Sequence, residues 1–87
     1  MPMLRTGSVV TVYVGIADEA RVAELLARDG HTWLRSTGVY VAPSGTVDAA
    51  VFRVSVHGLG SGRLVKKLRA AQQSIWLTFD VTGEVGF

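Results

Sequence analysis

The segment Val51–Gln72, which reads VFRVSVHGLGSGRLVKKLRAAQ, contains the residues whose types and spacing come nearest to a chemical site. An alternating strand pattern leads into Gly58, Gly60 and Gly62, and a basic amphipathic helix pattern follows. Backbone N–H groups at a helix N-terminus attract anions, because the helix dipole places about half a positive charge there. The segment therefore offers a candidate anion or partner site, and the competing interpretation is that the glycines serve a tight strand-to-helix turn that needs left-handed backbone.

The cations of this segment favour the anion interpretation. Arg63 falls in the first turn of the expected helix, where a positive charge costs roughly 0.3–1 kcal/mol unless an anion compensates it. The candidate anion- or partner-binding residues are Gly58, Gly60, Ser61, Gly62, Arg63, Lys66, Lys67 and Arg69.

The glycine pattern matches no motif that would name a reaction. A dinucleotide fingerprint would need glycine at Arg63, and a P-loop would need Gly-Lys-Ser/Thr at wider spacing. A nucleophile elbow would need glycine at Leu59. We therefore assign no catalytic residue and expect a non-enzymatic protein.

Metal and cofactor sites are not expected either. The chain contains no cysteine, and its two histidines, His31 and His57, have no carboxylate at ligand spacing. His57 near Ser61 is the one pair that could serve as base and nucleophile. A histidine that bonds a backbone carbonyl in a loop is the commoner arrangement, so we assign no metal, no cofactor and no catalytic pair.

The composition predicts self-association. The 87 residues are 48% hydrophobic and 18% charged, whereas about 25% charged residues is typical. Such a short chain leaves much surface uncovered, so we expect apolar surface to be shared in a homodimer.

The net charge of +2 is mild, and no apolar run reaches the ~20 residues that span a bilayer. The N-terminal apolar stretch lacks a cleavage pattern, so we expect no membrane contact and a cytoplasmic location.

The hydrophobic periodicity predicts four strands and two helices. Asp18 is suited to cap the first helix, Gly30 to end it in left-handed backbone, and Ser61 to cap the second helix. Gly38 suggests a bulge in the second strand. The expected strands span residues 8–16, 31–42, 48–57 and 74–82, and the expected helices span residues 18–29 and 61–72, with a turn at 42–46 between the second and third strands.

The order β-α-β-β-α-β describes a ferredoxin-like α+β sandwich, in which two helices cover one face of a four-stranded antiparallel sheet. We expect one such domain over residues 8–87, preceded by a flexible arm at residues 1–7. The other sheet face would remain open.

The open face should carry Tyr13, Arg53, His57 and Trp76. Two hypotheses follow. Aromatic rings beside a guanidinium can stack nucleic-acid bases, and RNA-recognition domains use this sheet face, although the third strand lacks the two aromatic residues of their RNP1 motif. Alternatively, the face is buried in a dimer.

Other families with this order of elements supply further hypotheses. Acylphosphatases have a glycine-rich loop and an arginine after the first strand, where this chain has Gly15-Ile16-Ala17-Asp18 without the arginine. Cas2-type nucleases have an aspartate at the end of that strand, where this chain has Val14 and Gly15. ACT-type regulatory domains share the topology and bind amino acids at a dimer interface. The leading hypothesis is a small interaction module that self-associates through its sheet and contacts a protein or anionic partner through the 58–62 loop and the basic helix. The alternatives are a nucleic-acid-binding domain and an ACT-like small-ligand sensor.

Overall fold

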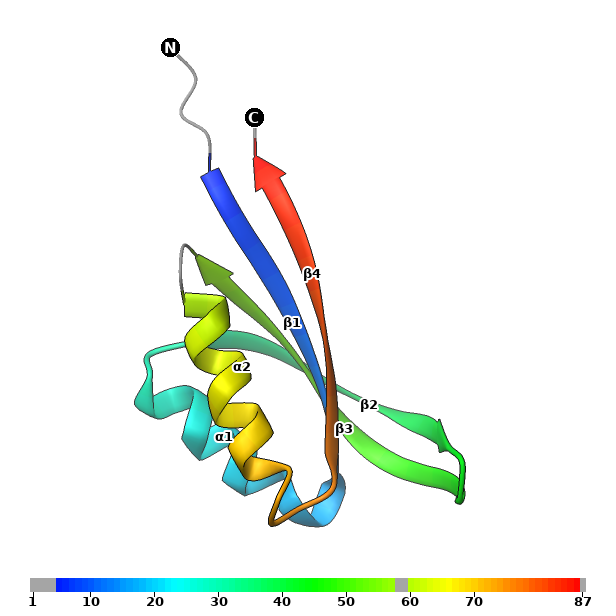
Figure 1. Cartoon of the computed structure of the whole chain (residues 1–87). Helices are drawn as coiled ribbons and strands as arrows, with labels where there is room; N and C mark the ends of the chain where they lie inside the picture. The colour runs from blue at the N-terminus through cyan, green and yellow to red at the C-terminus, as the bar shows by residue number, and fades with distance from the viewer. Residues whose placement is uncertain (1–4, 58–59, 87) are drawn as a thin grey trace.

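The computed structural model describes residues 5–57 and 60–86. Figure 1 shows two helices that lie together on one side of a twisted sheet. The βαββαβ order confirms the predicted ferredoxin-like α+β fold. The elements are β1 (Arg5–Gly15), a 3-10 turn (Ile16–Asp18), α1 (Glu19–Arg28), β2 (Thr32–Ala42), β3 (Gly45–His57), α2 (Gly60–Ala71) and β4 (Leu77–Gly86).

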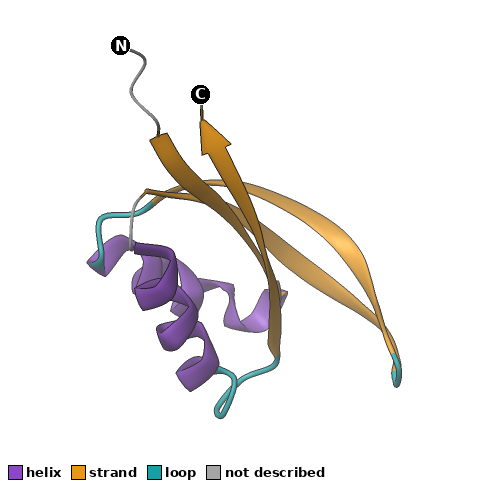
Figure 2. Ribbon diagram, turned by 45° about the horizontal axis from the view of Figure 1, so that its top comes forward, coloured by secondary structure: helices purple, strands orange, loops and turns teal. Residues whose placement is uncertain are grey.

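The four strands form one antiparallel sheet in the order β2-β3-β1-β4. Both helices cover the same face, as Figure 2 shows. Since β1 lies between β3 and β4, it separates His57 of β3 from Asp80 of β4. Strands β2 and β4 form the two edges of the sheet.

The hydrophobic core lies between the helices and the sheet. In β1, β3 and α2, the core residues recur with the expected periods of two and about 3.6. Phe52 is the largest fully buried side chain, and its ring centroid lies 6.0 Å from that of Trp33. The other core side chains include Val10, Val12, Val14, Val22, Leu26, Ala50, Val54, Val56, Leu64, Leu68 and Leu77.

Three strands have boundaries that differ from the expected ones by three residues or more: β1 and β3 begin earlier, and β4 begins and ends later along the chain. β1 begins at Arg5 rather than Ser8, because its backbone pairs with β4 as far as Arg5 opposite Gly86. Residues 5–7 of the expected arm are thus in the strand, and residues 1–4 lie outside the described residues. β4 begins at Leu77, because a turn follows α2 in which the Ile75 N–H donates to the carbonyl of Ala71.

β2 and β3 form a hairpin that extends beyond the helices (Figure 1). The turn is shorter than expected, since Ala42 pairs with Gly45 around two residues. The predicted bulge at Gly38 is wrong, because Gly38 pairs with Ala49 in an unbroken register. Val39 and Val41 alternate toward the helix side of the sheet, but no helix lies beneath them, and they are 64% and 76% exposed.

The end of α1 follows the prediction more closely than its start. Gly30 has a φ of +72°, and its N–H donates to the Ala27 carbonyl while the His31 N–H donates to the Leu26 carbonyl. These two bonds form a Schellman motif. At the start, Asp18 occupies the capping position without a side-chain capping bond. No helix in the described part of the chain is long and apolar enough to cross a membrane.

Arg35 of β2 ties that strand to the start of α1. Its guanidinium donates two hydrogen bonds to the Glu19 carboxylate, one of them 2.7 Å long between Nη2 and Oε1. These bonds hold the pKa of Glu19 below its ordinary value.

Candidate functional site

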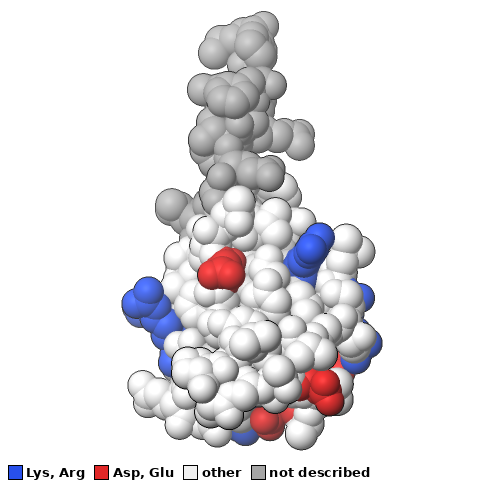
Figure 3. All heavy atoms as spheres, turned by 90° about the vertical axis from the view of Figure 1, so that its right-hand side faces the viewer, with Lys and Arg blue, Asp and Glu red and all other residues white. Residues whose placement is uncertain are grey.

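The strand register places three of the predicted open-face residues on one side of the sheet. Tyr13 pairs with Val51, Thr11 with Arg53 and Gly7 with His57, and these pairs all alternate away from the helix-covered face. Figure 3 views the side of the molecule that lies to the right in Figure 1, and uncharged residues dominate it. The uncovered face of the sheet is therefore a candidate contact surface.

Three aromatic rings from three chain segments meet on this face. The ring centroids of Tyr13 and Tyr40 lie 5.3 Å apart, and those of Tyr40 and Trp76 lie 5.4 Å apart. Both separations fall in the range in which tilted or edge-to-face rings attract. We call Tyr13, Tyr40 and Trp76 the aromatic trio.

The sequence analysis missed Tyr40 as a site residue. Tyr40 lies on β2 and Tyr13 on β1, so their rings meet across the intervening strand β3. β3 contributes Ala49 at this level, a small residue that is fully buried although it belongs to the open face. The small side chain of Ala49 therefore leaves room for the rings of Tyr13 and Tyr40 to meet above β3.

Arg53 lies beside a separate shallow depression of about 340 Å³ on the same face. Val9, Leu34 and Ser55 also line it, and Leu34 is 75% exposed. Within the described residues, no carboxylate forms an ion pair with Arg53. The depression thus combines exposed apolar surface with one guanidinium.

The second predicted site lies at the start of α2. The helix begins at Gly60, so Ser61 lies inside its first turn, and the expectation that Ser61 caps the helix is wrong. Gly58, together with Leu59, lies outside the described residues. Arg63, Lys66 and Arg69 are exposed, and none forms an ion pair with a carboxylate that the structure describes.

The structure does not support the interpretation that Gly62 serves a tight turn with left-handed backbone. It lies within the first turn of α2, and left-handed φ values among the described glycines occur only at Gly30 and Gly45. A Cβ added at Gly62 would meet no atom of the described residues within 4 Å. Neither backbone conformation nor close packing among the described residues therefore requires glycine at this position.

Lys67 differs from the other cations of α2 because it has a partner. Its Nζ donates a hydrogen bond of 2.6 Å to Oδ1 of Asp29, which follows α1. This bond is the main reason that the pKa of Asp29 lies below its ordinary value, and the charges of His31 and Arg63 act in the same direction. Asp29 Oδ2 is buried without a hydrogen-bond partner, and Nε2 of His31 is 3.9 Å from it.

The predicted residues thus form two groups on opposite sides of the sheet. Tyr13, Arg53 and Trp76 belong to the open face, whereas α2 covers the other face. A single nucleic-acid strand lying on the open face would not also contact the exposed cations of α2. Among the described residues, no three His, Cys, Asp or Glu side chains are grouped closely enough to hold a metal ion.

The comparisons with known proteins identify similar folds. No protein-family model matches the sequence, and no curated protein sequence matches it. CPII, a nitrogen regulatory PII-like protein from Thiomonas intermedia K12 bound to ADP, AMP and bicarbonate, superposes with a TM-score of 0.82 at 12% identity, covering 95% of this chain and 90% of that chain. Its complex with ADP, AMP and acetate gives a TM-score of 0.69 at 12% identity, covering 99% of this chain and 93% of that chain.

A third solved structure is a Bacillus cereus protein related to NIF3. It gives a TM-score of 0.63 at 14% identity, covering 99% of this chain but 27% of that chain. At these identities the likenesses establish the ferredoxin-like fold alone.

Proposed function

We propose that this chain is a small non-enzymatic binding module that self-associates through its open sheet face and binds a small anion at the start of α2. The observation that carries the proposal is the open face, where the aromatic trio and the exposed Leu34 lie on a surface that neither α1 nor α2 covers. The proposal includes a cytoplasmic location. It assigns no cofactor and no membrane contact.

Burial of the open face accounts for its composition. Removing apolar surface from water contributes about 25 cal/mol per Å², and a large exposed apolar patch marks an interaction surface. The patch lies on an ordered sheet, so little conformational entropy is lost when a flat partner covers it. A second copy of the same face supplies such a partner, and the simplest assembly is a dimer.

Oligomer formation is tested by light scattering coupled to size exclusion at tens of micromolar protein. Leu34→Glu places a charge on the open face and should convert the assembly to monomer. Gln73→Glu adds the same charge at the exposed turn after α2 and should leave the assembly intact. A wild-type chain that runs as a monomer would refute self-association.

The anion site rests on the first turn of α2. Its N–H groups have no intrahelical acceptors, and the exposed Arg63 and Lys66 add positive charge next to them. Glycine at residue 62 lets a ligand approach the backbone closely. ADP, AMP, bicarbonate and acetate, which are bound by the structurally similar CPII, are all anions, and this supports an anionic ligand of the nucleotide or small carboxylate class.

Titration calorimetry with ADP, AMP and bicarbonate tests this site. Arg63→Ala combined with Lys66→Ala should weaken binding, whereas Gln73→Ala, at the exposed turn after α2, is the control. Gly62→Ala should stabilise the helix by up to about 1 kcal/mol and yet weaken binding, because the methyl group covers the N–H groups. Equal affinity in wild type and Gly62→Ala would argue against a backbone contact.

Two further functions are tested with the same protein. Arg53 beside its apolar depression favours single-stranded nucleic acid as a second candidate, and that binding should weaken steeply as salt rises. For the ACT-like hypothesis, a bound amino acid should raise the free energy of unfolding by RT ln(1 + [L]/Kd), which a thermal-shift assay detects as a higher melting temperature. A protein partner at α2 is a further form of the leading proposal.

A further inference from the structure

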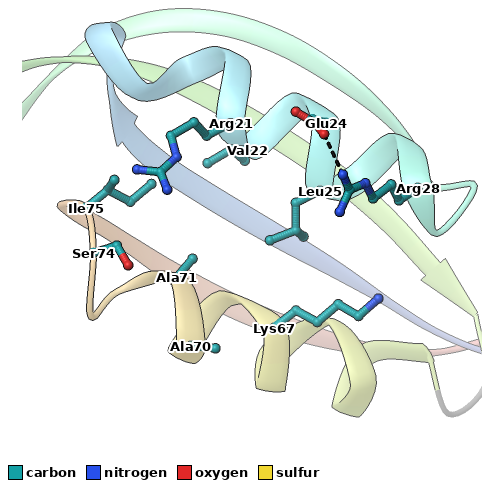
Figure 4. Close-up of a pocket in the computed structure, with 10 residues that line it drawn as sticks. All are labelled: Arg21, Val22, Glu24, Leu25, Arg28, Lys67, Ala70, Ala71, Ser74 and Ile75. Atoms are coloured by element: carbon teal, nitrogen blue, oxygen red, sulfur yellow. Dashed lines mark hydrogen bonds and ion pairs between the residues drawn. The ribbon is translucent and has the colours of Figure 1, made fainter.

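A groove of about 510 Å³ runs between α1 and α2 on the side of the molecule opposite the open face. Figure 4 shows that α1 contributes Val22 and Leu25 to it, and that α2 and the following turn contribute Ala71 and Ile75. Val22 is almost fully buried, and the other three are partly buried residues that contact the core. The floor of the groove is therefore apolar.

Small side chains explain why the groove is open. The inward row of α2 begins with Leu64 and Leu68, which are fully buried. One turn later the row continues with Ala71, and Ala70 and Ser74 lie beside it along the groove. These side chains are too short to reach α1, so the space between the helices is left unfilled.

The groove is positively charged along its rim. Arg21, Arg28 and Lys67 line it, with Glu24 as the one acidic side chain among its lining residues. Arg28 is paired with Glu24 at 2.7 Å and Lys67 with Asp29 at 2.6 Å. Arg21 forms no ion pair with any carboxylate of the described residues. In Figure 4 its guanidinium lies at the end of the groove that carries Ser74 and Ile75.

We propose that this groove binds a small amphipathic carboxylate. The apolar or aromatic body of the ligand lies on Val22, Leu25 and Ala71. Its carboxylate accepts hydrogen bonds from the Arg21 guanidinium and the Ser74 hydroxyl. This site is separate from the oligomer interface and from the anion site at the start of α2.

Size and charge select this class of ligand. Small-molecule sites of about 300–1,000 Å³ with mostly apolar walls and a few polar groups are typical of proteins. The guanidinium fork matches the two oxygens of a carboxylate. One unpaired guanidinium with Glu24 on the same rim suits a single negative charge, whereas a dianionic phosphate would lack a second unpaired cation.

The test uses 1-naphthaleneacetate as the probe and two-dimensional amide NMR as the readout, on the full chain. Saturable shifts should concentrate on α1 and on α2 around Ala71. The neutral analogue 1-naphthaleneethanol should bind about tenfold more weakly, as expected when a charge-assisted hydrogen bond is lost. Equal affinities for the two probes, or shifts confined to the open face, would overturn the proposal.

Variants locate the two halves of the site. Arg21→Gln should lower the affinity for 1-naphthaleneacetate about tenfold. Ala70→Phe adds a ring at the exposed rim and should block both probes without disturbing the core. Unchanged affinity in Arg21→Gln would exclude the assigned carboxylate contact. Binding that persists in the Arg63→Ala, Lys66→Ala double variant separates this site from the one proposed at the start of α2.

Discussion

Lys67 of α2 donates a 2.6 Å hydrogen bond to Asp29, which directly follows α1, and so links the two helices. A carboxylate at this end of a helix opposes the negative end of the dipole, which a nearby cation offsets. The interaction assigns Lys67 an internal role and leaves Arg63, Lys66 and Arg69 as the exposed cations of α2. The basic helix of the sequence thus contains one cation that links the two helices and three whose side chains are exposed.

The Asp29–Lys67 bond predicts a loss of stability in acid. The pKa of Asp29 is lower in the folded chain than its ordinary value of 3.8, so the folded state favours the ionised form. The contribution is present above the unfolded pKa and is lost as pH falls from about 3.8 through the lower folded value. Urea unfolding between pH 7 and pH 2 measures it.

Asp29→Asn should flatten the acid side of this stability profile. Glu19→Gln serves as a comparison, because the pKa of Glu19 is also lowered and its loss acts in the same direction. A profile for Asp29→Asn as steep as that of the wild type would show that the bond does not contribute.

Gly30 should resist substitution. Its φ of +72° lies in the left-handed region, where a side chain costs roughly 1–2 kcal/mol. Gly30→Ala should lower the free energy of unfolding by about that amount in urea titrations. Gly15→Ala is the matched control, because Gly15 has a φ of −57° and an added Cβ would meet no atom within 4 Å. That variant should keep or raise the stability by up to about 1 kcal/mol, and equal losses in both would contradict the backbone argument.

Phe52 should be the most sensitive position of the core. It is 1% exposed and lies beside Trp33, so Phe52→Ala should cost about 3–5 kcal/mol through lost burial and the cavity that remains. Val41→Thr keeps a β-branched side chain at a position that is 76% exposed, and it should change stability by no more than about 0.5 kcal/mol. Chemical unfolding of both variants compares them directly, and a small loss in Phe52→Ala would mean that the core collapses around the missing ring.

The contact between Tyr40 and Trp76 should be measurable as a coupling energy. A double-mutant cycle with Tyr40→Leu and Trp76→Leu should give about 0.5–1.5 kcal/mol for the edge-to-face pair. Tyr40 and Trp33 alternate toward opposite faces of the sheet, so the stability changes of the two single substitutions in that control pair should add without a coupling energy. Additivity for Tyr40 and Trp76 would indicate that their rings do not interact in solution.

The parts of the fold that depend on local periodicity could be predicted from the sequence. Val10, Val12 and Val14 occupy every second position of a central strand with one covered face. Their alternation along the sequence therefore predicts that they are buried. β2 is an edge strand that extends past the helices, and its residues are exposed on both faces from Leu34 to Val39. A strand without a covered face has no alternation of hydrophobic and polar residues, so the sequence of β2 does not indicate on which face Tyr40 lies.

The parts that depend on contacts between distant segments could not be predicted. Asp29 and Lys67 are 38 positions apart, and no spacing rule connects them. The groove between the helices arises because Ala71 continues a row that Leu64 and Leu68 begin. An alanine in the inward row of a helix is found both in closely packed cores and beside grooves. The groove could therefore be recognised only from the packing of α1 against α2.

The pairing of β1 with β4 determines how the chain responds to mechanical load. The two strands are antiparallel, with Arg5 opposite Gly86 at one end and Val14 opposite Leu77 at the other. Figure 1 shows that the N-terminal end of β1 and the C-terminal end of β4 lie side by side. A force that pulls these two ends apart acts on one backbone hydrogen bond at a time, starting at Arg5 and Gly86. The domain therefore unzips from that end under tension, and the strands separate before the force reaches the core residues at Val14 and Leu77.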